Sequence, residues 1–119
     1  IINVSSVMGI IGYAHGSIYG ASKAAVLSLT RSHALEFGRA IRVNSVVPGG
    51  VDTDMLRGLA MSIAGDVESG YEILSKDCAA QRRIADASEI AGPVLYLASD
   101  LASFVTGATH VVDGGEVLD

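Results

Sequence analysis

The chain opens with IINVSSVMG, residues 1–9, in which an apolar, β-rich segment over about 1–5 runs directly into a turn of serine and glycine. A long helical segment over about 17–37 follows, and Gly38 stands where helices commonly end. A second β-rich segment spans about 41–47. Strand, helix and strand in this order are typical of a right-handed βαβ unit that contributes to a parallel sheet.

Two short amphipathic helices are expected after the second strand, over about 55–64 and about 71–79. The dipeptides Gly65-Asp66 and Ser69-Gly70 are typical of breaks, and we expect them to separate the two helices.

A further helix is predicted from Asp86 to about residue 98, because Asp86 and Glu89 have the spacing of a capping box. The last β-rich segment spans about 108–112. About three strands that alternate with helices are typical of right-handed βαβ units, and they predict an α/β fold with a doubly wound, Rossmann-like parallel sheet.

Composition narrows the class of protein. The chain has 119 residues, of which 50% are hydrophobic and 18% charged, with a formal net charge of -5. Its length suits one domain. Basic residues form no cluster, so neither nucleic acid nor an anionic membrane is expected as a partner, and no apolar run approaches the ~20 residues of a membrane span. Cys78 is the one cysteine, which excludes an internal disulfide and favours a cytoplasmic protein.

Metal binding is not expected, because His15, His33 and His110 share no metal-ligand spacing. The chain begins inside a β-rich segment without a methionine, and its high apolar content suits the interior of a larger parallel-sheet domain. We therefore expect residues 1–119 to be part of a larger domain.

Three side chains form a candidate catalytic set at the carboxyl end of the first strand, where ligands bind in doubly wound sheets. Tyr19 follows Ser6 by thirteen residues, and Lys23 follows Tyr19 by four, so the latter two share one helix face. A phenol loses its proton near pH 10, but an ammonium group ~4 Å away would favour the phenolate by ~4 kcal/mol at an effective dielectric of 20. Ser6 would hold the reacting oxygen of a substrate.

A tyrosine with a lysine one turn later is also common on solvated helix faces, and a serine turn alone carries little information. The three residues in this order and at this spacing, after a strand, are a more specific signal than either motif alone. The segment Asn3–Gly9 is similar to the active-site serine segment of the short-chain dehydrogenase/reductase family, and Tyr19–Lys23 is similar to its Tyr-x-x-x-Lys motif. The resemblance implies that Tyr19 exchanges the proton, while Lys23 tunes it and binds the nicotinamide ribose.

A second match lies at the second strand. Residues 44–53 are similar to the family's Asn-x-x-x-Pro-Gly-x-x-x-Thr. The resemblance implies that the sharp turn at Pro48 and Gly49 lets the chain pass close beneath the nicotinamide ring. It implies further that the backbone at Val51 meets the carboxamide, and that the Thr53 hydroxyl reaches the carboxamide or the pyrophosphate.

The chain resembles the C-terminal half of such a protein along nearly all of its length, and residues 107–115 are similar to the family's last strand and its Val-Asp-Gly-Gly ending. The glycine-rich phosphate loop of a Rossmann unit has no counterpart. We therefore expect residues 1–119 to be the C-terminal catalytic half of one NAD(P)-binding domain without its N-terminal half, unable to bind cofactor alone, with an exposed edge on the first strand.

The resemblance implies an oxidoreductase that interconverts a ketone and a secondary alcohol by hydride transfer with NAD or NADP. The expected substrate is a small carbonyl or alcohol compound, and the segment of about 54–83 is expected to form a mobile flap over it. The expected assembly is a homo-oligomer, either a dimer or a tetramer. Two alternatives stay open from the sequence. One is a catalytically silent fragment that serves as a scaffold or oligomerisation domain, and the other is an epimerase or dehydratase of the same fold.

Overall fold

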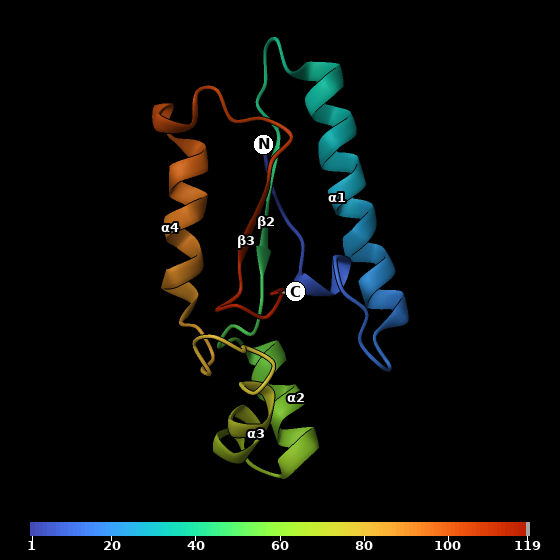
Figure 1. Cartoon of the computed structure of the whole chain (residues 1–119), viewed down its shortest axis with the longest axis vertical. Coiled ribbons are helices and arrows are strands. Elements are labelled where there is room, and N and C mark those ends of the chain that lie inside the picture. The colour runs from blue at the N-terminus through green and yellow to red at the C-terminus, as the bar shows by residue number, and fades with distance from the viewer. Residues whose placement is uncertain (119) are drawn as a thin grey trace.

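A computed structural model describes residues 1–118 and shows a three-stranded parallel sheet (Figure 1). The strands are β1 (Ile2–Val4), β2 (Asn44–Pro48) and β3 (Thr109–Val112), in the order β1-β2-β3. In the register, Val46 of β2 lies between Val4 of β1 and His110 of β3. The three expected strands are confirmed, although β2 begins three residues later than expected.

Within residues 1–118, six helical segments connect and flank the strands. The long helix is found at the predicted residues, and the capping-box helix begins one residue after its Asp86 cap. In chain order the segments are η1 (Val7–Gly9), α1 (Ser17–Phe37), α2 (Asp54–Ala64), α3 (Val67–Leu74), α4 (Ala87–Ala98) and η2 (Asp100–Ala102).

The two long helices cover opposite faces of the sheet (Figure 1). Adjacent residues of a strand point to opposite faces. On one face, Val47 of β2 packs with Leu27 of α1 and Val7 of η1. On the other, Val46 packs with Leu97 of α4 and a group of apolar residues around it. The doubly wound α/β class is thereby confirmed, and the core lies on both sides of β2.

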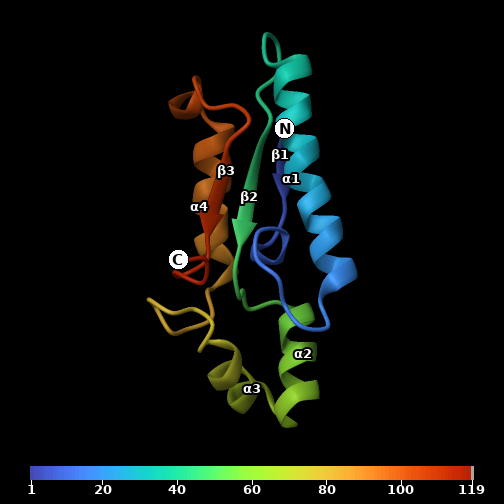
Figure 2. The ribbon, with the colours of Figure 1, turned by 45° about the vertical axis from the view of Figure 1, so that its right-hand side comes forward.

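The hand of the second connection differs from the expectation. Because the chain crosses the sheet in one direction, from β1 to β2 to β3, helices on opposite faces require connections of opposite hand. In Figure 2, α1 lies in front of the sheet and α4 behind it, so β1-α1-β2 is right-handed and the connection from β2 to β3 is left-handed. The expectation of right-handed units throughout is therefore wrong.

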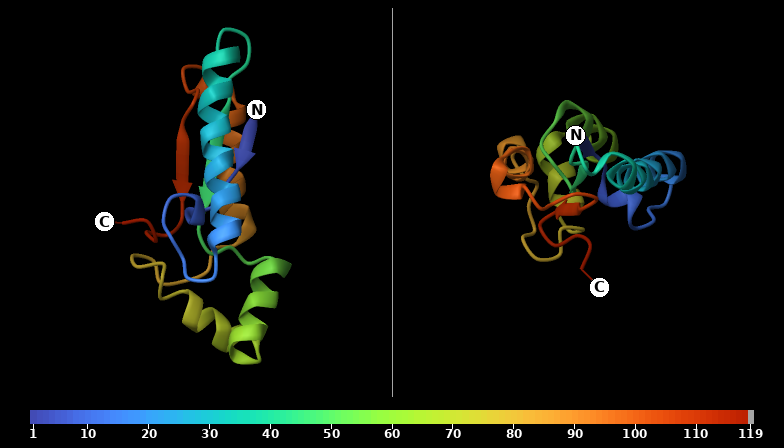
Figure 3. Two further views of the ribbon diagram at one scale, coloured as in Figure 1. Left: turned by 90° about the vertical axis from the view of Figure 1, so that its right-hand side faces the viewer. Right: turned by 90° about the horizontal axis from the view of Figure 1, so that it is seen from above.

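The physical reason is the long excursion through α2 and α3. The right-handed rule holds where a twisted strand feeds a helix that packs straight back onto the sheet. Here the chain first leaves the sheet, and it returns only where Ala85 pairs with Val51 in an isolated parallel bridge. Figure 3 shows α2 and α3 as an arm beyond the end of the strands. The twist of β2 therefore does not dictate the face that α4 covers.

The start of α4 agrees with the sequence. Asp86 and Glu89 form a complete capping box, in which the Glu89 carboxylate accepts the Asp86 N–H at 2.9 Å. Arg83 donates two hydrogen bonds of 2.7 Å to the same carboxylate. This interaction with Arg83, followed by the backbone hydrogen bond, lowers the pKa of Glu89 to about 2. The carboxylate thus stays ionised, as the positive end of the helix dipole favours.

The helix expected over 71–79 lies earlier in the chain. α3 begins at Val67 because the Asp66 carboxylate accepts the Ser69 N–H at 2.8 Å, so Asp66 is an N-cap and not a break. Gly70 lies inside this helix. A Cβ on Gly70 would come within 2.5 Å of Ala60 in α2. The glycine is therefore the contact surface on which the two helices of the arm pack.

We expect Gly70→Ala to loosen the arm, because overpacking a contact of this kind costs about 1–3 kcal/mol. Gly58→Ala is the matched control, since nothing lies within 4 Å of its added Cβ and alanine favours a helix by about 1 kcal/mol over glycine. Amide hydrogen exchange in α2 and α3 measures both effects. It should become faster in Gly70→Ala and slower in Gly58→Ala; equal protection in the two variants would contradict this packing argument.

Buried polar side chains brace β2. The Asn44 amide nitrogen donates to the Val105 carbonyl at 2.8 Å, and its oxygen accepts the Ala108 N–H at 3.0 Å. The Asn44 side chain thereby anchors the segment that leads into β3, which explains why a buried asparagine stands at the start of the strand β2.

Among residues 1–118, no helix is both long and apolar enough to span a membrane.

Candidate active site

The strands point to one edge of the sheet, where the loops after β1, β2 and β3 gather (Figure 2). This is the carboxyl edge, at which doubly wound sheets bind their ligands. The sequence-predicted residues come to this edge from three elements: the loop of η1, the first turns of α1 and the loop from β2 to α2.

The loop after β1 packs tightly against α1. A Cβ on Gly9 would lie 2.8 Å from the backbone carbon of Lys23, and a Cβ on Gly20 would lie 2.7 Å from the Met8 carbonyl oxygen. Real Cβ atoms do not approach backbone atoms this closely, so only glycine permits the contact. The two glycines therefore set how near the serine loop comes to the helix that carries Tyr19.

The two serines of the loop have different environments. Ser5 is buried, and its hydroxyl donates to the Lys23 carbonyl at 2.8 Å, which ties the end of β1 to α1. Ser6 is partly exposed and caps η1, where its hydroxyl oxygen accepts the Met8 N–H at 3.2 Å. That bond uses an acceptor position and leaves the Ser6 hydroxyl hydrogen to be donated to a substrate oxygen.

Tyr19 and Lys23 lie on one face of α1, as the four-residue spacing predicts. The Lys23 Nζ lies 5.5 Å from the centre of the Tyr19 ring, within the range of a cation–π contact. Nζ also donates to the Val4 carbonyl at 3.2 Å, which holds the ammonium group at the end of β1. Tyr19 is 39% exposed. The phenol is therefore open to a ligand while the ammonium group stays beside it.

The loop after β2 holds the other predicted residues. Pro48 ends the strand, and the Gly49 N–H donates to the Val112 carbonyl at 3.2 Å. Val51 pairs with Ala85 at the base of the arm. The Thr53 hydroxyl accepts the Leu56 N–H at 3.3 Å and donates to the Val51 carbonyl at 3.3 Å, so Thr53 is the N-cap of α2.

Sequence reasoning missed a polar cluster at the base of the arm. Asp52 accepts hydrogen bonds from Arg57 Nε at 2.7 Å and from the Tyr71 hydroxyl at 2.6 Å. The bond from Arg57 and then that from Tyr71 hold the pKa of Asp52 below its usual value. Asp52 thus joins the loop after β2 to both α2 and α3. The spacing of Tyr71 carries no local signal for this contact, because it lies nineteen residues away.

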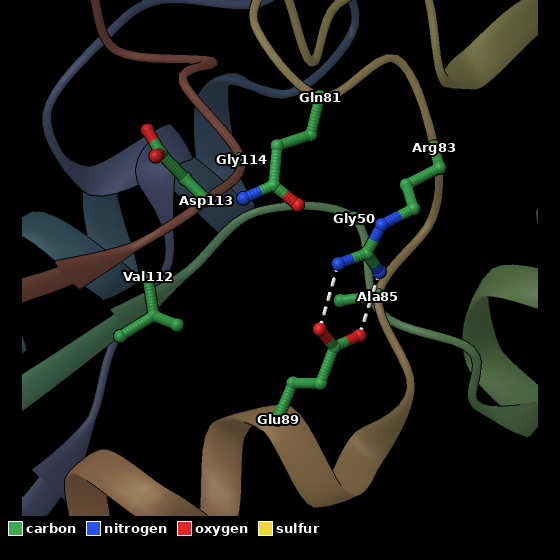
Figure 4. Close-up of a pocket in the computed structure, with 8 residues that line it drawn as sticks. All are labelled: Gly50, Gln81, Arg83, Ala85, Glu89, Val112, Asp113 and Gly114. Atoms are coloured by element: carbon green, nitrogen blue, oxygen red, sulfur yellow. Dashed lines mark hydrogen bonds and ion pairs between the residues drawn. The ribbon is translucent and has the colours of Figure 1, made fainter.

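A small pocket opens beside Gly50 on the α4 side of the sheet edge (Figure 4). Arg83 and Glu89 form its polar wall and satisfy each other. None of the predicted catalytic side chains lines it. Residues 1–118 also contain no group of histidine, cysteine and acidic side chains that could hold a metal ion. The open surface at Tyr19 is therefore the stronger candidate site.

Comparisons with known proteins show which proteins the chain is similar to. Residues 1–116 match the family model described as enoyl-(acyl carrier protein) reductase. The chain is 42% identical over 116 residues to cis-4-hydroxycyclohexanecarboxylate dehydrogenase of Sinomonas cyclohexanicum, a match that covers 97% of this chain and 43% of the relative. The chain spans less than half the length of the curated relatives it matches.

Solved structures of dehydrogenases are also similar to this chain. Ligand-free aldohexose dehydrogenase of Thermoplasma acidophilum superposes with a TM-score of 0.92 at 37% identity, over 98% of this chain and 47% of that one. A 4-hydroxyisoleucine dehydrogenase mutant in complex with NADH and succinate superposes with a TM-score of 0.85 at 33% identity, over 98% of this chain and 46% of that one.

Proposed function

Because the chain belongs to the short-chain dehydrogenase/reductase family of oxidoreductases, we propose that it carries the reacting end of an enzyme that interconverts a ketone and a secondary alcohol with NAD or NADP. The observation that carries the proposal is the packing of the Ser6 loop on the turns of α1 that bear Tyr19 and Lys23. This packing brings a hydroxyl donor, a phenol and an ammonium group to one edge of the sheet.

Each of the three residues has a role in the proposed reaction. Ser6 donates its hydroxyl hydrogen to the substrate oxygen and holds it in place. Tyr19 gives a proton to that oxygen in reduction and takes one in oxidation. Lys23 stabilises the phenolate through its charge and keeps its position through the Val4 carbonyl. The nicotinamide, when bound, supplies or accepts the hydride.

The residues present fit a nicotinamide cofactor. Lys23 uses one of its three ammonium hydrogens on Val4, which leaves others for a ribose hydroxyl. We propose that Pro48, Gly49, Val51 and Thr53 form the nicotinamide side of the cofactor site together with Tyr19 and Lys23.

We further propose that residues 1–119 are the C-terminal catalytic half of a single NAD(P)-binding domain. Support comes from β1, which has only β2 as a neighbour among residues 1–118 and whose Val4 is largely exposed. An open strand of this kind offers unpaired backbone groups to further strands.

We also propose that the protein is cytoplasmic, because the buried Cys78 forms no disulfide and a free thiol suits a reducing compartment.

The experiment that tests the function uses the full-length protein. Its alcohol substrates should include cis-4-hydroxycyclohexanecarboxylate and an aldohexose, after which two of the similar proteins are named. Reduction of NAD or NADP in proportion to alcohol consumed is the expected result. Formation of an epimer without net change in cofactor would favour an epimerase. Failure of the protein to bind either cofactor would favour a silent scaffold. The 119-residue chain alone is expected to bind neither.

A homo-oligomer, dimer or tetramer, is the assembly we propose, because Leu95 of α4, Leu101 of η2 and Phe104 beyond it expose most of their side chains. Exchanging Leu101 and Phe104 for serine should raise the dissociation constant of the oligomer at least about 30-fold, since interface hot spots contribute 2 kcal/mol or more. Light scattering after size-exclusion chromatography measures it. Met55→Ser, on the arm, is the control for losing an exposed apolar side chain. A monomeric wild-type protein would overturn the assembly.

A further inference from the structure

Glu116 follows the turn at the end of β3 and lies at the carboxyl edge of the sheet. The Asp113 carboxylate accepts the N–H groups of Gly115 at 2.9 Å and Val117 at 2.7 Å, which holds this turn closed. Gly114 and Gly115 have positive φ angles of 64° and 87°. The turn directs the chain back toward the loops of the candidate site, where the Glu116 side chain contacts Tyr13.

The Glu116 carboxylate contacts three separate loops. The Tyr13 hydroxyl, in the loop between η1 and α1, donates to Oε1. The Cys78 sulfur, on the return from α3, lies 3.9 Å from Oε2. A Cβ on Gly49, in the loop after β2, would lie 2.6 Å from Oε2, so the carboxylate rests directly on this loop. One side chain therefore joins the serine loop, the loop after β2 and the arm.

The charged groups near Glu116 are carboxylates, which disfavour its ionised form. Burial raises the pKa of Glu116, the Asp77 and Asp113 carboxylates raise it further, and the bond from Tyr13 opposes these effects. Burial and the Glu116 carboxylate likewise raise the pKa of Tyr13. No cation is among the groups that act on Glu116. A half-buried carboxylate without a cation is costly, and the two donors, Tyr13 and Cys78, offset part of that cost.

We propose that Glu116 is a positioning residue, which holds the Gly49–Gly50 backbone against the Tyr13 loop and so fixes the nicotinamide-facing loop relative to Ser6 and Tyr19. The inference rests on the function proposed above. An ionised carboxylate is suited to the role because it only accepts hydrogen bonds, and both of its hydrogen-bond partners, Tyr13 and Cys78, are donors. A glutamine of the same shape would present an N–H₂ group to one of these donors and leave a hydrogen bond unmade.

The test compares Glu116→Gln with Glu36→Gln in the full-length protein. Glu36 is exposed near the end of α1, so its exchange makes the same chemical change away from the site. We expect Glu116→Gln to lower kcat about 10- to 100-fold, since a displacement of about 1 Å can cost a hundredfold, while the melting temperature stays near that of the control. The isotope effect with deuterated NAD(P)H should rise as the hydride step becomes slower.

The pH profile separates positioning from mere packing. For ketone reduction, in which Tyr19 acts in its protonated form, kcat/KM of the wild-type protein should fall on the acid side as Glu116 gains a proton, and Glu116→Gln should lack that limb. Tyr13→Phe removes one of the two donors and should give a smaller loss. Its effect should not add to that of Glu116→Gln in the double variant, because the two side chains share one hydrogen bond.

Amide hydrogen exchange provides a readout that does not depend on turnover. Glu116→Gln should speed exchange in residues 9–16 and 49–51, and Glu36→Gln should not. If Glu116→Gln speeds loop exchange while the wild-type protein itself shows no NAD(P)H turnover, that result would support the tie between the loops and reject the proposed function. Turnover, pH profile and loop exchange all equal to those of the Glu36→Gln control would overturn the role of Glu116.

Discussion

Tyr19→Phe is expected to lower kcat for alcohol oxidation about 100- to 10,000-fold, the range that a positioned general acid or base contributes. The phenol oxygen is the only part of the side chain removed. The ring is 39% exposed and keeps its place beside the Lys23 ammonium group, so stability should change little. The measurement is NAD(P)H formation by the full-length protein with whichever alcohol gives the fastest turnover.

The matched control is Tyr96→Phe, which removes the same hydroxyl from a partly exposed tyrosine of α4. It should retain wild-type turnover. Cofactor binding, measured by NAD(P)H fluorescence, separates two explanations for a loss in Tyr19→Phe. Binding within a few-fold of wild type places the defect in proton transfer. Equal kcat in the Tyr19 variant, the control and the wild type would show that another group exchanges the proton.

Gly20→Ala has the second large effect, because it forces the serine loop off α1. The added Cβ would lie 2.7 Å from the Met8 carbonyl oxygen, and neither partner is a flexible side chain. Overpacking costs about 1–3 kcal/mol, which exceeds the gain of about 1 kcal/mol from the better helix former. Displacing Ser6 from Tyr19 by about 1 Å should lower kcat/KM about a hundredfold. Thermal unfolding and turnover measure the two losses.

Gly12→Ala is the control for this experiment, since it makes the same exchange in the same loop and its Cβ meets nothing within 4 Å. It should leave both turnover and melting temperature close to wild type. Gly9→Ala should behave like Gly20→Ala, because its Cβ would meet the backbone of Lys23 from the opposite side of the contact. If Gly20→Ala and Gly12→Ala had equal activity, the close approach of loop and helix would have no part in the proposed catalysis.

Local signals in the sequence predicted much of the fold. The helix over 17–37 and the Asp86–Glu89 capping box were predictable because helix periodicity and capping depend on residues three or four positions apart. The pairing of Tyr19 with Lys23 was predictable for the same reason. The start of α3 differs from the prediction because Gly65-Asp66 is typical of a break, whereas an aspartate three residues before Ser69 also suits an N-cap.

Contacts between distant segments carried no such signal. Tyr13 and Glu116 are separated by 103 residues, and Cys78 and Glu116 by 38. The position of Glu116 after the last strand placed it at the carboxyl edge, but its neighbours depend on how three loops fold together. The left-handed connection to β3 was not predictable for a related reason. The rule that strand-helix-strand connections are right-handed assumes a helix that follows its strand directly.

By itself the sequence determined the α/β class, the order of the elements and the side-by-side placement of a phenol and an ammonium group, because these depend on short-range periodicity and on helix geometry. The tertiary structure alone decided which face of the sheet α4 covers, how closely Gly9 and Gly20 let the serine loop approach α1, and which donors surround Glu116. These features depend on close packing between segments far apart in the chain, and packing acts only once the chain has folded.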